Sequence, residues 1–159
     1  MEKDNNIEKY YGKYGKVKWI EKNEKINGDV YALECRPKEV NSENILLNPI
    51  DIVQFLIVDR KEPKRTTIFC FRIAKKKNLG EHALEILNEV NKEILYGKFT
   101  IGSDEDIDWE YTYEEGNIDE ESVSDFLDSC LSGIAKIVIL SVREQKKGNE
   151  VGKTAESKE

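Results

Sequence analysis

Residues 107–113 alternate between apolar and polar side chains, and this pattern constrains the fold more than any other part of the chain. The apolar positions are Ile107, Trp109, Tyr111 and Tyr113. Because successive side chains of a β-strand point to opposite faces, a period of two predicts a strand with one buried face. The aromatic row is most simply part of a core, and the alternative is that part of it lines a groove for a partner.

The segments around this strand predict a domain of mixed helices and strands. Apolar residues recur at helical spacing near residues 7–14, over 81–95 and from residue 119 onward. Further strands are predicted over residues 17–20, 30–35, 52–58, 66–74 and 99–101. Short connections favour antiparallel pairing of neighbouring strands. We therefore expect an α+β fold in which an antiparallel sheet packs against helices.

The end of the chain changes in character near residue 142. Residues 137–142 are rich in β-branched side chains and fit a strand, although the helical stripe through Val138 favours a helix. Residues 143–159 have almost no large apolar side chains, so they cannot bury enough surface to offset the entropy of ordering. We expect a single domain over residues 1–142 and a mobile polar tail over 143–159.

The charge distribution argues against several classes of function. The formal net charge is −7, and residues 99–135 contain twelve acidic residues and no basic ones. Nucleic-acid binding needs clustered cations, so nucleic acid is not an expected partner. No apolar run approaches the roughly 20 residues that span a bilayer, and no signal peptide is recognisable, so we expect a cytoplasmic protein without a membrane partner.

The sequence does not present a catalytic motif. Cys35, Cys70 and Cys130 are odd in number and lie in apolar patterns, which indicates buried, inert thiols. The single histidine, His82, has no cysteine near it in sequence and fits an exposed position at the start of a helix. We therefore expect a protein that is not an enzyme and that needs no cofactor.

The acidic turn before residue 109 offers one alternative function. Asp104, Asp106, Asp108 and Glu115 fall at positions one, three, five and twelve of an EF-hand-like loop. Such a loop needs glycine at its sixth position, and this chain has Trp109 there. A solvated acidic hairpin is the simpler interpretation. The alternative is a regulatory domain that senses a metal or a small molecule through this hairpin.

Several short motifs resemble one family. Leu87–Asn91, Gly97–Phe99, Trp109 and the helix start Ile118–Glu121 are similar to the YbjN family of the type III secretion chaperone-like superfamily. The resemblance covers about residues 50–140. It implies the order helix, three antiparallel strands, helix, β-hairpin and long helix.

The resemblance also implies a function. Members of this group are cytoplasmic, often dimeric, and secretion chaperones of this fold wrap an extended segment of a client protein. We therefore expect a non-catalytic, chaperone-like homodimer that recognises a segment of another protein on a sheet face or edge. The residues expected at the contact, or supporting it, are Phe71, Phe99, Trp109 and Tyr111.

Overall fold

The computed structural model describes residues 6–47, 49–114 and 118–156, with side chains described as far as residue 147 in the last helix. The strands are β1 (Gly15–Asn23), β2 (Gly28–Cys35), β3 (Val53–Lys61), β4 (Lys64–Lys75), β5 (Lys98–Ile101) and β6 (Asp106–Glu114). The α-helices are α1 (Asn6–Tyr11), α2 (Pro37–Val40), α3 (Ala83–Glu93) and α4 (Glu120–Glu156). Two short 3-10 turns, η1 (Ile45–Leu47) and η2 (Lys76–Leu79), lie in the connections.

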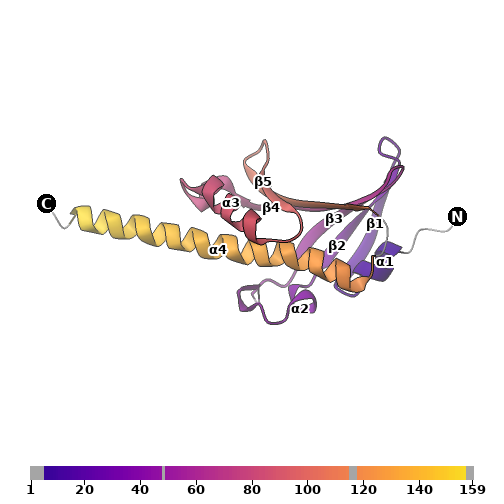
Figure 1. Cartoon of the computed structure of the whole chain (residues 1–159), viewed down its shortest axis with the longest axis horizontal. Coiled ribbons are helices and arrows are strands. Elements are labelled where there is room, and N and C mark those ends of the chain that lie inside the picture. The colour runs from indigo at the N-terminus through magenta and orange to yellow at the C-terminus, as the bar shows by residue number, and fades with distance from the viewer. Residues whose placement is uncertain (1–5, 48, 115–117, 157–159) are drawn as a thin grey trace.

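The strands form one antiparallel sheet in the order β1-β2-β3-β4-β6-β5. Figure 1 shows α4 running along one side of this sheet and continuing beyond it toward the C-terminus. The expected α+β class, with an antiparallel sheet and helices, is therefore confirmed. Four strands precede α3, whereas the family resemblance implies three. The individual strand patterns in the sequence predicted all four.

The face of the sheet toward α4 forms the core. Trp109 and Ile57 are fully buried there, together with Leu127 and Leu131 of α4. Phe126 of α4 packs its ring against Tyr111 and Tyr113, with ring centroids 4.7 Å and 5.2 Å apart. The aromatic row of β6 is thus core, as its alternation predicted. The helical layer covers one face of the sheet.

The last helix resolves the ambiguity over residues 137–142, which are helical. Ile137 is buried, whereas Val138 and Val142 are about half exposed. The helix continues through most of the polar segment and ends at Glu156. The domain boundary near residue 142 and the mobility of residues 143–159 stay predictions. Among the described residues, none of the helices combines the length and the apolar character needed to cross a membrane.

The three cysteines are free and buried, as their apolar settings predicted. Burial raises the pKa of the Cys35 thiol to about 12, and Cys70 nearby acts in the same direction. Burial likewise raises the pKa of Cys130, and a hydrogen bond with Cys70 adds to this effect. Because the thiolate is the reactive form, burial disfavours reaction at Cys35 and Cys130.

Candidate functional site

The face of the sheet that points away from the helices carries a strip of apolar side chains. Ala32, Leu56 and Phe69 lie opposite one another on β2, β3 and β4. Ile20 and Phe71 flank this row, and their exposed fractions are 47% and 49%. We call these five residues the open-face strip. Large exposed apolar side chains grouped in this way are uncommon on a monomeric surface and mark interaction sites.

A β-bulge shapes one side of the strip. The register between β4 and β6 shifts between Cys70 and Ala74, and Arg72 within the bulge has a φ of 55°. The left-handed region is unfavourable for arginine, so another contact must hold the backbone there. The backbone N–H of Arg72 donates to Oδ1 of Asp108 at 2.8 Å. Phe71 lies on the open face by regular alternation from Phe69, on which its ring stacks, and the bulge brings the next residue, Arg72, to the same side.

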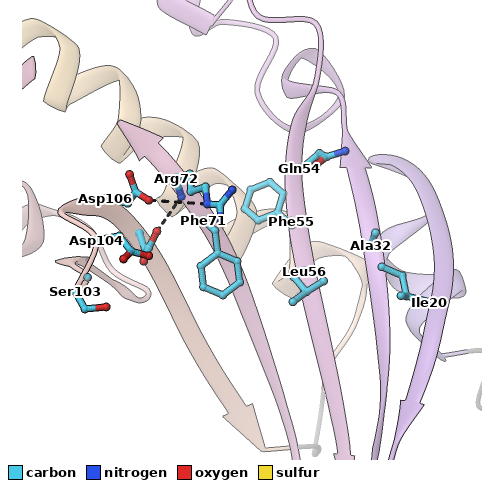
Figure 2. A pocket seen from close by; sticks show the side chains of 12 residues that line it. Ile20, Ala32, Gln54, Phe55, Leu56, Phe71, Arg72, Ser103, Asp104 and Asp106 are labelled. Atoms are coloured by element: carbon cyan, nitrogen blue, oxygen red, sulfur yellow. Dashed lines mark hydrogen bonds and ion pairs between the residues drawn. The ribbon is translucent and has the colours of Figure 1, made fainter. Parts of the chain in front are cut away.

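The strip forms part of a hollow of about 680 Å³. Figure 2 shows Ala32 and Leu56 on neighbouring strands, with Ile20 on one side and Phe71 with Arg72 on the other. The turn between β5 and β6 completes the wall beside the bulge and contributes Gly102, Ser103, Asp104, Asp106 and Asp108 to the lining. The hollow therefore has an apolar floor and one acidic wall.

Two of the acidic groups in this wall already have protein partners. Asp106 is 7% exposed, and its carboxylate pairs with Lys75 at 2.6 Å and with Arg72 at 3.9 Å. Asp108 accepts the hydrogen bond that holds the bulge. Asp104 is exposed. The wall thus combines two carboxylates that make contacts within the chain with one, Asp104, whose negative charge is exposed to solvent.

The opposite end of the open face is basic. Arg60 of β3 lies opposite Arg65 of β4, and Arg65 pairs with Glu114 of β6 at 3.4 Å. The Nε of Arg60 is buried and has no hydrogen-bond partner among the described residues. Because this atom is buried, the basic character offered to a ligand at this end comes from the rest of the partly buried Arg60 guanidinium and from the exposed Arg65.

The four residues expected at a partner contact do not lie together. Phe99 and Trp109 are buried under the helical layer, with exposed fractions of 2% and 0%. Tyr111 is partly buried on the same face and packs against Tyr96. Phe71 alone reaches the open face. Only Phe71 is placed for direct contact with a partner there, and the other three are placed to support the sheet from the core side.

Trp109 is fixed by specific contacts within that core. Its indole N–H donates to the carbonyl of Tyr96 at 3.2 Å, and its ring meets Phe55 edge-on with centroids 6.2 Å apart. A Cβ added at Gly97, which has a φ of 79°, would lie 2.5 Å from the indole nitrogen. Replacement of Trp109 is therefore expected to act on folding before it acts on binding.

The acidic hairpin does not assemble the calcium loop considered from the sequence. Trp109, at the sixth position of that loop, is a core residue of β6, and Glu115 lies outside the described residues. Among the residues that the structure describes, there is no group of three or more His, Cys, Asp or Glu side chains arranged to hold a metal ion.

The apolar run that predicts β3 also contains a signal for the open-face strip. Residues 52–58 form an almost unbroken apolar run. In an antiparallel sheet with helices on one side, a strand normally alternates, so a continuous run means that both faces of the strand are apolar. Leu56 and Val58 are the members of this run on the open face.

No family model, no curated protein and no solved structure matches this chain. The resemblance to the YbjN family therefore stays a prediction from short motifs.

Proposed function

We propose that this protein is a non-catalytic, chaperone-like binding domain that holds a segment of another protein on the open face of its sheet. The observation that carries this proposal is the open-face strip, in which Ile20 and Phe71 are exposed and Ala32, Leu56 and Phe69 are partly buried, in a chain with 36% charged residues. Burial of apolar surface supplies about 25 cal/mol per Å², and aromatic residues are favoured anchors in interfaces. The cytoplasmic location and the homodimer that the family resemblance implies stay predictions.

The face of the sheet is a better docking surface than the edge at β1. This edge strand carries Lys16, Lys18 and Lys22, and its register shifts between Trp19 and Glu21. Lysines and bulges on an edge strand oppose the addition of another strand. The centre of the open face, at Leu56, is apolar, and the charged side chains Lys18 and Glu110 flank the strip opposite Ala32 and Phe69. The acidic residues of the hairpin would favour a client with basic residues, because opposite charges steer association.

Photo-crosslinking from two positions tests this proposal. We would place p-benzoylphenylalanine at position 71 and, as a matched control, at position 84 on α3, where Leu84 is 60% exposed. In cells of the source organism, position 71 is expected to crosslink to one or a few proteins that position 84 does not capture. The additional substitution Leu56→Glu is expected to remove these products. The same products from both positions, or none from position 71, would contradict the proposal.

A further inference from the structure

The occupant of the open face can be specified further, on the basis of the proposed function. We infer that it is an amphipathic helix of a partner protein, which carries a basic residue at one end and an acidic residue at the other. The basic end lies beside the acidic wall formed by Asp104 and its neighbours, and the acidic end lies beside Arg60. This inference rests on backbone hydrogen bonding, on the dimensions of the face and on its charges.

Backbone hydrogen bonding favours a helix over an extended segment. The floor of the hollow belongs to β2 and β3, and each of these strands pairs with a neighbour on both sides. Their backbone N–H and C=O groups are used in the sheet, so an extended segment on this face would find no ladder to join. Its own backbone groups would be buried without partners, which is costly. A helix satisfies its backbone internally and presents only side chains to an apolar groove.

The dimensions of the face set the length of this helix. Gln54, Leu56, Val58 and Arg60 alternate along β3 on the open face. At a rise of about 3.3 Å per residue, the six steps from Gln54 to Arg60 span about 20 Å. A helix rises about 1.5 Å per residue, so about 13 residues cover this distance. Apolar residues at spacings of three and four would line one face of such a helix.

The charges at the two ends of the open face determine which charged residue of the partner helix lies at each end. At the hairpin end, the exposed Asp104 adds a negative charge to a wall in which Asp106 and Asp108 serve internal contacts. At the other end, the partly buried Arg60 and the exposed Arg65 lie opposite each other and place two positive charges, of which Arg65 also pairs with Glu114. A carboxylate can accept hydrogen bonds from a guanidinium in a bidentate geometry, so an acidic side chain fits this end best.

A second copy of the chain fits this surface less well than a helix does. Two copies packed face to face would bring two hollows of about 680 Å³ against each other. Opposed concave surfaces leave unfilled space, and interfaces of stable complexes are packed like protein interiors. A helix with its side chains is about 10–12 Å in diameter and is convex, so its basic end can enter the hollow beside Gln54 and Leu56 while the rest of it continues along β3 toward Arg60.

Synthetic peptides test the inference directly. The main probe is a stapled 14-residue helix with leucines on one face, lysine at one end and glutamate at the other. Matched probes carry lysine at both ends, glutamate at both ends, or a central proline in place of the staple. Affinity is measured by fluorescence anisotropy at low salt, and amide chemical shifts of the full-length protein locate the site. The lysine–glutamate helix is expected to perturb the amides of Ala32 and Leu56 and to bind about fivefold more tightly than either matched helix.

A charge reversal on the protein provides the second arm. With Arg60→Glu and Arg65→Glu together, the helix with lysine at both ends is expected to become the tightest ligand. Equal affinities for all three charged helices would overturn the inferred polarity. Equal or tighter binding of the proline peptide at the open face would overturn the helix and leave the proposed function standing.

Two further outcomes would also overturn the inference. Sedimentation equilibrium that shows a dimer, lost in Phe71→Glu and retained in Leu84→Glu, would assign the face to a second copy. Absence of shifts at the open face with every peptide, combined with crosslinks from position 71 in cells, would overturn the helical occupant alone. Absence of both the shifts and the crosslinks would overturn the inference and the proposed function together.

Discussion

The two faces of the sheet are built from the same strands, yet they differ in the burial and the hydrogen bonding of their side chains. On the core face, buried polar groups have partners: the hydroxyls of Tyr11 and Tyr113 lie 2.9 Å apart, and Thr66 donates to Asp59 at 3.0 Å. On the open face, Phe71 is half exposed and the Nε of Arg60 has no acceptor among the described residues. The buried polar groups named on the core face are paired within the chain. The open face leaves an aromatic ring half exposed and one donor unpaired among the described residues, which supports the proposal that a partner docks there.

Substitution of the two tryptophans is expected to give the largest contrast between a core position and a surface position. Trp109→Ala should lower the free energy of unfolding by about 3–5 kcal/mol, because it leaves a large cavity. Trp19→Ala, at a position that is 41% exposed on the edge strand, should cost about 1 kcal/mol or less. Urea unfolding followed by far-ultraviolet circular dichroism measures both values. Similar losses for the two variants would contradict the assignment of Trp109 to the core.

A methyl group at Gly97 is expected to have the next largest effect. Gly97→Ala places a Cβ against the Trp109 ring at a positive φ, so we expect a loss of about 2–4 kcal/mol. Gly80 is the control, because it also has a positive φ but has nothing within 4 Å of an added Cβ. Thermal or urea unfolding of both variants separates the steric contact from the backbone cost. If Gly80→Ala were as damaging as Gly97→Ala, the close approach to Trp109 would not be the cause.

Alkaline pH is expected to lower the free energy of unfolding gradually, through ionisable groups that are buried on the core face. Burial holds the pKa of Cys35 at about 12, against an ordinary value of 9.0, so the folded state keeps a proton that the unfolded chain releases. The stabilisation is fully present below pH 9 and is lost as the pH rises from 9 to 12. The loss from this thiol is at most about 1.4 kcal/mol per pH unit.

The slope of stability against pH between 9 and 11 measures this effect. Cys35→Ala is expected to have a shallower slope than the natural chain, whatever its absolute stability. A residual slope should remain, because burial also raises the pKa of Tyr11 and of Cys130. An unchanged slope in Cys35→Ala would mean that this thiol does not stay protonated in the fold.

The smallest effect on stability is expected at the open face. Phe71→Ser should lower the free energy of unfolding by only about 1 kcal/mol, because its ring is half exposed and loses little beyond its stacking on Phe69. Phe99→Ala, at a buried position on the core face, should cost about 3–5 kcal/mol. Parallel urea titrations compare the two. A large loss in Phe71→Ser would show that the open-face strip stabilises the isolated chain, which would weaken its interpretation as a docking surface.

Part of the candidate site could be predicted from the sequence. Phe71 was expected at a partner contact and lies on the open face. Phe99 and Trp109 were expected there too, and both lie in the core. The aromatic row of β6 has the same composition whether a helix or a partner covers it, so residue type alone does not separate these cases. The apolar run over residues 52–58 is the local signal that both faces of β3 are apolar.

Local patterns in the sequence predicted most of the secondary structure, because alternation and helical periodicity are properties of neighbouring residues, but they did not predict the continuation of α4 to Glu156. They predicted the strands, the two main helices, the helical state of residues 137–142 and the burial of the three cysteines. For β6 the alternation already indicated the core face, but for β3, which is apolar on both faces, long-range packing settles which face the helices cover. The bulge that brings Arg72 beside Phe71 depends in the same way on Asp108 of a different strand.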